Sequence, residues 1–223
     1  MAEPLLIVFD VNETLSDMAP LGEVFAQIGA PRGLAKLWFA TLLRDGFALT
    51  ASGDNEAFAA IGKDALRALL EAEGVSGNLD TAVERVMAAM QNLSLHADVP
   101  GGVRTLAAAG HRLATLTNGA AANTDRLLAA GGIRDKFELL LSVEDAPAWK
   151  PAKAAYLYAG ASAGVDPSGM LLVAVHPWDI HGAARAGLRT AWINRTGSRY
   201  PSYFRAPDIT VAALTELPPA LAS

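Results

Sequence analysis

The N-terminal part of the chain contains a short, continuous apolar run that ends abruptly in an acid. Residues 5–9 read Leu-Leu-Ile-Val-Phe, and Asp10 follows directly. A continuous apolar run of this length is typical of a strand buried on both faces, as in a parallel sheet. Ligands of such sheets bind beyond the carboxyl ends of the strands. The pattern therefore places Asp10 where an α/β protein carries out its chemistry, although this stretch alone is equally consistent with an ordinary turn.

The pattern changes to helical spacing between residues 21 and 93. Apolar residues recur every three or four positions in four consecutive stretches, and Asn78 or Asp80 is a candidate cap of the fourth. Four helices between one strand and the next predict a helical cap that is inserted into an α/β domain. The predicted boundaries are residues 16–96 for the cap and residues 1–15 with 97–223 for the core.

From residue 100 onward, strand-like apolar runs alternate with helical stretches. Strands are predicted at residues 112–117, 137–142, 170–175, 189–193 and 209–211. Pro151 suits the first turn of the helix that follows the third strand of the sheet. The alternation predicts a doubly wound parallel sheet, a Rossmann-like α/β core with right-handed crossovers.

Polar side chains recur at the carboxyl ends of the predicted strands. They are Asp10 after the first strand, Thr117 and Asn118 after the second, Lys150 after the third, and His176, Trp178 and Asp179 after the fourth. In a parallel sheet these ends converge on one crevice. Two carboxylates, an amine, a hydroxyl and an amide in one crevice form a set that is suited to nucleophilic catalysis.

Composition and charge remove several classes of function. The chain has 223 residues, 52% of them hydrophobic, with 18 basic and 23 acidic residues and a net charge of -5. This balance, without a basic run, speaks against nucleic acid and anionic membranes as partners. Cysteine is absent, which excludes disulfides, a thiolate metal site and a cysteine nucleophile and fits a reducing cytoplasm. The N-terminal apolar run is too short for a signal peptide or a membrane span.

The order of the polar motifs resembles that of the haloacid dehalogenase superfamily, and more narrowly its L-2-haloacid dehalogenase branch. The motifs are Asp10-x-Asn12-x-Thr14, Thr117-Asn118-Gly119, Lys150-Pro151, and Trp178-Asp179-Ile180-x-Gly182-Ala183-x-x-Ala186-Gly187. The resemblance covers essentially the whole chain, including the helical insert, and the four motifs are specific together although each alone is weak. It implies a homodimer that acts on short haloacids.

The resemblance implies a role for each acidic or basic motif residue. Asp10 is the expected nucleophile: it displaces halide and forms an aspartyl ester, which water then hydrolyses. Lys150 is expected to orient Asp10 and to keep it ionised. Asp179 is expected to fix Lys150 and to help position the hydrolytic water, and it is also a candidate cap of its helix.

Three neutral residues complete the implied site. Thr14 and Thr117 are expected to hold the nucleophile or the substrate carboxylate by hydrogen bonds. For Thr14 a purely structural role near the strand end is equally consistent with the pattern. Asn118 is expected to donate a hydrogen bond to the substrate or to the leaving halide.

Two positions distinguish dehalogenation from phosphate hydrolysis, the commoner activity of the superfamily. Phosphatase members usually carry a second Asp two residues after the nucleophile, where this chain has Asn12, a candidate substrate-binding residue. A halide leaving group needs no proton, so this loss is harmless. Phosphatases also bind Mg²⁺ through a Gly-Asp pair, which an ungapped alignment on Asp179 matches to Ala174 and Val175. Because Val175 has no side-chain oxygen for a hard cation, no catalytic metal or other cofactor is expected.

One departure concerns the leaving halide. L-2-haloacid dehalogenases carry a halide-binding Arg on the cap, and its ungapped match here is Thr41. Arg44 lies one helical turn later and is a candidate substitute. His176 and Trp178 are alternative candidates for a compact halide pocket, which would suit fluoride. Two other functions stay open: a phosphatase or phosphonate hydrolase with an atypical metal site, and a non-catalytic member that binds a small acid or a protein.

Overall fold

The computed structural model describes residues 5–222 and divides them into two compact units. One unit ends at Ser16 and resumes at Ser94, and the other spans Asp17–Leu93. Two short strands lie at these boundaries, β2 (Ser16–Asp17) and β3 (Ser94–Leu95), and they pair in a two-stranded sheet. Each unit has its own architecture.

The first unit contains a six-stranded sheet in which all described strand pairs are parallel. Its strands are β1 (Leu6–Phe9), β4 (Arg112–Thr117), β5 (Leu139–Ser142), β6 (Met170–Ala174), β7 (Arg189–Ile193) and β8 (Ile209–Val211). Their order across the sheet is β5-β4-β1-β6-β7-β8. The predicted doubly wound parallel sheet is confirmed.

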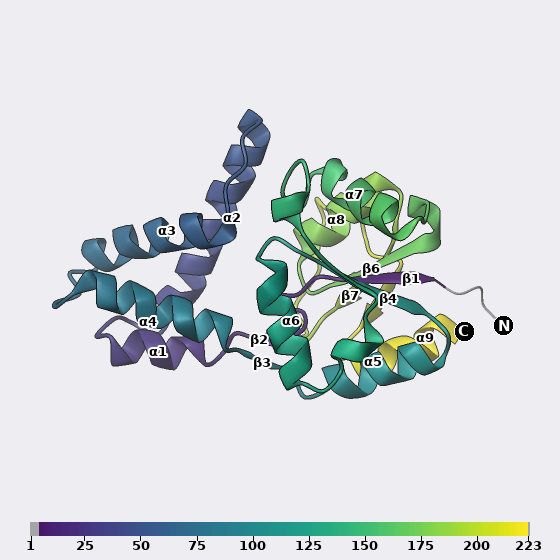
Figure 1. The fold of residues 1–223 in the computed structure, drawn as a ribbon, viewed down its shortest axis with the longest axis horizontal. Coiled ribbons are helices and arrows are strands. Elements are labelled where there is room, and N and C mark those ends of the chain that lie inside the picture. Colours follow the sequence, from purple (N-terminus) through teal and green to yellow (C-terminus); the bar gives the residue numbers. More distant parts are fainter. Residues whose placement is uncertain (1–4, 223) are drawn as a thin grey trace. The chain divides into compact units, whose positions relative to one another are not determined.

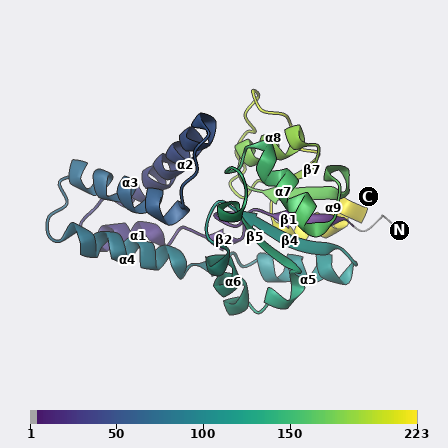
Figure 2. The same cartoon turned by 45° about the horizontal axis from the view of Figure 1, so that its top comes forward.

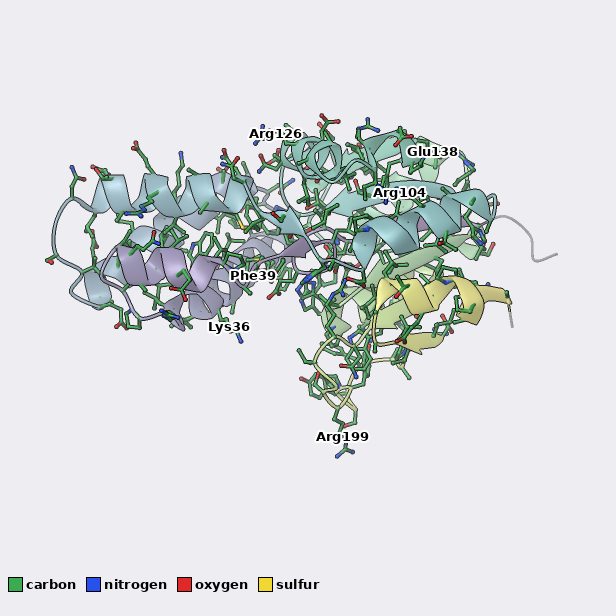
Figure 3. All side chains as sticks on the ribbon, turned by 90° about the horizontal axis from the view of Figure 1, so that it is seen from below. Lys36, Phe39, Arg104, Arg126, Glu138 and Arg199 are labelled. Atoms are coloured by element: carbon green, nitrogen blue, oxygen red, sulfur yellow. The ribbon has the colours of Figure 1, made fainter. Side chains whose placement is uncertain are left out.

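Helices cover both faces of this sheet. They are α5 (Val99–Ala108), α6 (Ala121–Ala130), α7 (Lys153–Ala163), α8 (Pro177–Ala186) and α9 (Leu217–Ala222), with 3-10 turns at Arg134–Lys136, Val143–Asp145, Pro167–Gly169 and Leu214–Glu216. Helices α7 and α8 lie on one side of the sheet, and α5 and α9 lie on the other (Figure 1). Ile7 and Phe9 of β1 pack with Val103 of α5 and Leu128 of α6 in one apolar cluster. Charged side chains such as Arg104 and Arg126 project from these helices at the surface (Figure 3).

The strand order determines where a ligand can bind. After β1 the chain adds β4 and β5 on one side of it, and later adds β6, β7 and β8 on the other. The order therefore reverses at β1, and the carboxyl ends of β4, β1 and β6 lie next to one another. Asp10 follows β1 directly and occupies this reversal point.

The second unit is helical. It consists of α1 (Leu21–Gln27), α2 (Leu34–Ser52), α3 (Phe58–Ala72) and α4 (Leu79–Gln91), with α1 beside α4 and α3 against both α2 and α4 (Figure 2). Asn78 caps α4, as one of the two predicted alternatives, and accepts a hydrogen bond from the Thr81 amide. The indole of Trp38 is buried and donates to the Gly62 carbonyl at 2.8 Å.

One prediction about local structure is wrong. Pro151 does not lie in the first turn of a helix, because α7 begins at Lys153 with Ala152 as its N-cap. The main chain of Lys150 is instead hydrogen-bonded to Asn118, so this part of the chain still belongs to the loop. No helix within residues 5–222 is both long enough and apolar enough to cross a membrane.

Candidate active site

The ammonium group of Lys150 joins two carboxylates, one that directly follows β1 and one on helix α8. Its Nζ donates to Asp10 Oδ1 at 2.8 Å and to Asp179 Oδ2 at 2.6 Å. Lys150 and Asp179 are fully buried, and Asp10 is 4% exposed. A buried ammonium is tolerated only when its charge and its donors are matched, and two carboxylates supply this match. The structure thus brings together the three charged residues that the motifs singled out.

Asn118 determines where Lys150 lies. Its Nδ2 donates to the Lys150 carbonyl at 3.2 Å, and its Oδ1 accepts from the Lys150 amide at 3.0 Å. Asn118 directly follows β4, so these two bonds tie the loop after β5 to the neighbouring strand of the sheet. The amide expected to donate to the substrate therefore uses one of its two N–H donors to position Lys150.

The second oxygen of Asp10 has two partners of its own. Thr14 Oγ1 donates to Asp10 Oδ2 at 2.6 Å, and His176 Nδ1 lies 3.1 Å from the same oxygen. The amide of Val175 donates to Thr14 Oγ1 at 3.1 Å. Because the hydroxyl oxygen of Thr14 accepts this hydrogen bond with a lone pair, the hydroxyl proton points toward Asp10. The structure places Thr14 and His176 together at the expected nucleophile.

His176 also contacts an acid that sequence reasoning missed. Its Nε2 lies 2.9 Å from Glu13 Oε2, so both ring nitrogens face carboxylates. Glu13 has φ of 60°, a left-handed conformation, and its carbonyl is 3.0 Å from His96 Nε2. The position of Glu13 inside the Asp-x-Asn-x-Thr motif was the available signal. Its contact partner lies 163 residues away in sequence and could not be foreseen.

The charges around Asp10 determine its ionisation. Burial alone would raise the pKa of Asp10, but Lys150 and His176 outweigh this effect and hold the pKa well below its usual range. Burial alone would lower the pKa of Lys150, yet Asp10 and Asp179 raise it above its ordinary value. Asp10 is therefore a carboxylate and Lys150 an ammonium at every pH at which enzymes are normally assayed.

His176 is also charged at neutral pH. Burial would lower its pKa, but hydrogen bonds with Asp10 and Glu13 raise the pKa from 6.5 to about 9. The imidazole ring stacks on Trp178, with centroids 5.0 Å apart, and the Lys150 ammonium lies 5.9 Å from the Trp178 ring. Trp178 therefore packs against both cations of the site.

Tyr156 is a second residue that sequence reasoning missed as part of the site. Its hydroxyl donates to Asp179 Oδ1 at 2.6 Å and is fully buried. Burial raises the pKa of Asp179, an effect that Lys150 only partly offsets, and burial and Asp179 raise the pKa of Tyr156 well above 10.0. The sequence placed Tyr156 in a helix after Lys150 but gave no reason to turn its hydroxyl toward Asp179.

Gly182 allows α8 to approach this network. A Cβ atom on Gly182 would lie 2.6 Å from Pro151 Cβ and 2.7 Å from the Tyr156 hydroxyl. Asp179 lies one helical turn earlier on the same helix. The glycine of the fourth motif therefore lets the helix that carries Asp179 pack against the segment after Lys150.

The remaining predicted residues lie elsewhere or have other partners. Thr117 is buried, and its hydroxyl accepts from the Gly119 amide at 3.0 Å, which stabilises the turn after β4. Asn12 is partly buried in the loop after β1. Thr41 and Arg44 lie on α2 of the helical unit, where Arg44 is exposed and pairs with Asp45 at 2.8 Å. Their contact with a halide stays a prediction.

The residues present do not fit a magnesium site. Oxygen ligands are what Mg²⁺ prefers, and the oxygens of Asp10 already accept from Lys150, Thr14 and His176. Val175 has no side-chain oxygen, and its carbonyl accepts from Trp192 Nε1 at 2.9 Å. A divalent cation at Asp10 would lie beside two cationic side chains, Lys150 and His176, whose repulsion opposes its binding.

Comparisons with known proteins agree on one family. A model of the haloacid dehalogenase-like hydrolases matches residues 5–187. The (S)-2-haloacid dehalogenase of Pseudomonas sp. (strain YL) is 32% identical over 213 residues, 93% of this chain and 90% of the relative. Haloacetate dehalogenase H-2 of Moraxella sp. (strain B) is 35% identical over 117 residues, 52% of each chain. The crystal structure of a dehalogenase with an intermediate complex has a TM-score of 0.91 at 27% identity and covers all of both chains.

Proposed function

Because the chain belongs to the family of haloacid dehalogenase-like hydrolases, we propose that it hydrolyses the carbon–halogen bond of short 2-haloacids, with Asp10 as its nucleophile. The observation that carries this proposal is the buried contact of 2.8 Å between Asp10 and Lys150. It keeps a carboxylate ionised in a site that is almost inaccessible to water. A desolvated, oriented carboxylate is suited to displace halide from carbon.

The first step is an in-line displacement. An oxygen of Asp10 attacks the carbon that bears the halogen, the new C–O bond forms, and the halide leaves with the electron pair of the C–X bond. No proton is needed, so Asn12 in place of a second Asp does not hinder this step. The product of the step is an ester between Asp10 and the acid.

The second step is hydrolysis of this ester. Water attacks Cγ of Asp10, and the 2-hydroxy acid leaves as the carboxylate is regenerated. Asp179 is the group suited to accept a proton from water, because burial raises its pKa. Lys150 lies against Asp10 Oδ1 and is suited to protonate the departing alkoxide.

We propose that this reaction needs no metal ion. The support for this is the donor set at Asp10, which consists of an ammonium, a hydroxyl and an imidazolium. These groups perform the charge compensation that Mg²⁺ supplies in phosphoryl transfer. Activity is therefore expected to be unaffected by EDTA.

The direct test measures halide release. Purified protein is incubated with chloroacetate, fluoroacetate and 2-chloropropionate in the presence of EDTA, and halide and the hydroxy acid are quantified. Wild-type protein is expected to release halide and Asp10→Asn is not. Asp125→Asn is the matched control, since Asp125 is an exposed acid that pairs with Arg134. Hydrolysis of an aryl phosphate that requires Mg²⁺, without halide release, would refute the proposal. Binding of a haloacid without turnover would instead indicate a non-catalytic member.

Three further proposals rest on the family resemblance. The helical unit Asp17–Leu93 is proposed to act as the cap, with Thr41 or Arg44 near the leaving halide. The protein is proposed to be a homodimer, which light scattering in solution would test. A cytoplasmic location is proposed because a chain without cysteine suits a reducing compartment.

A further inference from the structure

We propose that His176, oriented by Glu13, acts with Thr14 as an oxyanion hole that speeds hydrolysis of the Asp10 ester rather than its formation. This inference rests on the proposed function, since it assigns a role within the second step of that reaction. It makes His176 a catalytic residue, because its ring contacts the reacting carboxylate, and Glu13 a positioning residue.

The two oxygens of Asp10 are not equivalent. Among the described residues, Oδ1 accepts from Lys150, whereas Oδ2 accepts from both Thr14 and His176. A carboxylate oxygen has two in-plane lone pairs, so Oδ2 has both committed and Oδ1 retains one. Oδ1 is therefore the oxygen that attacks the substrate carbon, and Oδ2 remains as the carbonyl oxygen of the ester.

This assignment places the donors where negative charge develops. When water attacks Cγ of the ester, the π electrons of the carbonyl move onto Oδ2, and the water proton passes to Asp179. The electron pair on Oδ2 then re-forms the carbonyl, and the bond between Cγ and Oδ1 breaks. Oδ1 leaves as part of the hydroxy acid and takes a proton from Lys150. The new carboxylic acid of Asp10 returns a proton to Lys150, and Asp179 releases one to solvent. The 2.6 and 3.1 Å contacts at Oδ2 thus face the transient oxyanion.

The surroundings of His176 require a charged ring. A neutral imidazole has one N–H donor and one acceptor, but both ring nitrogens here lie within 3.1 Å of carboxylate oxygens. Only the imidazolium donates from both. The charged or titratable groups around it include Asp10 and Glu13 in direct contact, Lys150 at the other oxygen of Asp10, His96 at the Glu13 carbonyl and Arg195 at the Thr14 carbonyl.

Glu13 becomes more important once the ester forms. Esterification removes the charge of Asp10, so Glu13 is the carboxylate that still contacts His176 and keeps it protonated. Glu13 holds this position with φ of 60°, which L side chains rarely adopt and glycine adopts freely. A glutamate at such a position indicates that its side chain is used.

The same geometry explains why the effect should fall on one step only. A cation at Oδ2 withdraws electron density from the carboxylate, so it does not promote attack by Oδ1. It does stabilise the charge that appears on Oδ2 during ester hydrolysis. Removing one donor of an oxyanion hole typically slows the step by about 100-fold or more.

The test separates the two steps with chloroacetate in rapid-quench experiments on the full chain. For His176→Gln, which keeps an N–H donor but carries no charge, halide should still appear in a rapid first turnover. Because a neutral amide is a weaker donor than an imidazolium, ester hydrolysis should be slower by about 10-fold, so a carboxymethyl ester accumulates on Asp10 and is detected by mass spectrometry. His181→Gln is the matched control, since His181 lies on the same helix and accepts from the Arg205 amide.

Glu13→Gln tests the positioning role. The Glu13 side chain is 42% exposed, so the substitution removes charge without opening a cavity. The rate of ester hydrolysis in the wild type should fall as His176 loses its proton, at a lower pH than in the free enzyme because the ester of Asp10 carries no charge. Glu13→Gln should move this fall further downward by about one pH unit or more. Glu138→Gln is the control, because Glu138 lies at the surface (Figure 3). Its partner there is Arg112.

The outcomes distinguish the inference from the proposed function. The inference would be overturned if His176→Gln lost the halide burst and ester hydrolysis to the same extent. It would also be overturned if the pH profile of ester hydrolysis were the same in Glu13→Gln and the wild type. Either result would leave the proposed dehalogenase function intact. A wild-type protein that releases no halide from any haloacid would overturn the proposed function and the inference with it. Both the inference and the proposed function would be supported if the ester accumulated in His176→Gln and the pH profile of ester hydrolysis shifted in Glu13→Gln.

Discussion

Asn118 holds the main chain of Lys150 from both sides. Its side-chain amide donates to the Lys150 carbonyl at 3.2 Å, and its side-chain oxygen accepts from the Lys150 amide at 3.0 Å. This pair of bonds connects β4 to the loop after β5. The position of the only amine that contacts Asp10 within residues 5–222 thus depends on a neutral residue.

Asn118→Ala should therefore lower activity without touching the charged groups. Two buried main-chain groups of Lys150 would lose their partners, which we expect to cost about 1–3 kcal/mol of unfolding free energy. Halide release should fall by roughly 10- to 100-fold, since a small displacement of a catalytic group has effects of this order. Asn123→Ala, on α6, is the control and should change neither quantity appreciably. Denaturant unfolding measures the free energy of unfolding, and a halide assay measures the activity. Unchanged activity in Asn118→Ala would contradict the role of Asn118 in positioning Lys150.

Lys150→Met should destabilise the fold and alter the pH dependence of the first step. Two buried carboxylates would lose their common cation, and breaking such a pair typically costs about 3–5 kcal/mol. Asp10 would lose one of the two cations that oppose the effect of burial, so the pKa of Asp10 should rise and the proposed nucleophile should be protonated at a higher pH than in the wild type. Lys136→Met is the control, because Lys136 is a surface residue that pairs with Asp135. A Lys150→Met protein of wild-type stability would show that the buried pair is not what balances these charges.

Tyr156→Phe should act through Asp179. The substitution removes the hydroxyl that donates to Asp179 Oδ1 at 2.6 Å and leaves a fully buried carboxylate oxygen with one partner fewer. We expect a loss of about 1–3 kcal/mol and a further rise in the pKa of Asp179. Ester hydrolysis should be affected more than halide release, because Asp179 is proposed to act on water. Tyr203→Phe, at a 79% exposed position, serves for comparison in thermal melts and rapid-quench assays.

Gly182→Ala should be poorly tolerated for steric reasons. The added methyl group would lie 2.6 Å from Pro151 Cβ and 2.8 Å from the Pro151 carbonyl oxygen, closer than real Cβ contacts. We expect a loss of about 1–3 kcal/mol as α8 is pushed away from the segment after Lys150. Gly101→Ala tests the same exchange on α5, where the nearest atom would be 3.7 Å away, and should be neutral or stabilising. Equal melting temperatures for the two variants would refute this explanation of the fourth motif.

Stability should depend on pH through His176. Its pKa is raised from 6.5 to about 9 in the folded protein, so folding favours the protonated ring. The contribution to stability is fully present below pH 6.5 and is lost as the pH rises through about 9. The melting temperature should therefore fall between these values, and it should fall less in His176→Gln. An identical decline in both proteins would assign the effect to other groups.

The fold followed from the sequence because its signals are local. The apolar run before Asp10 and the alternation after residue 100 predicted the parallel sheet, and the strand predicted at residues 112–117 is the observed β4. The helical spacing between residues 21 and 93 predicted the four helices. Each of these patterns is set by which side chains must be buried on a strand or on a helix, and this is visible without knowing the neighbours.

The site was only partly predictable. The ends of parallel strands meet, so the sequence placed Asp10, Lys150 and Asp179 in one crevice. It did not show that Asn118 binds the main chain of Lys150 or that Glu13 and Tyr156 contact the charged residues. These contacts join residues that are 23 to 163 positions apart, and they depend on side-chain directions that no spacing encodes.

The sequence by itself determined the class of fold, the family resemblance and the candidate for the nucleophile, since each depends on residue types at fixed local spacings. Only the tertiary structure decided which oxygen of Asp10 faces which donor, and that His176 lies between two carboxylates. The physical reason is that hydrogen bonding and ionisation depend on distances of a few ångströms between distant segments. Such distances exist only once the sheet, α7 and α8 have packed together.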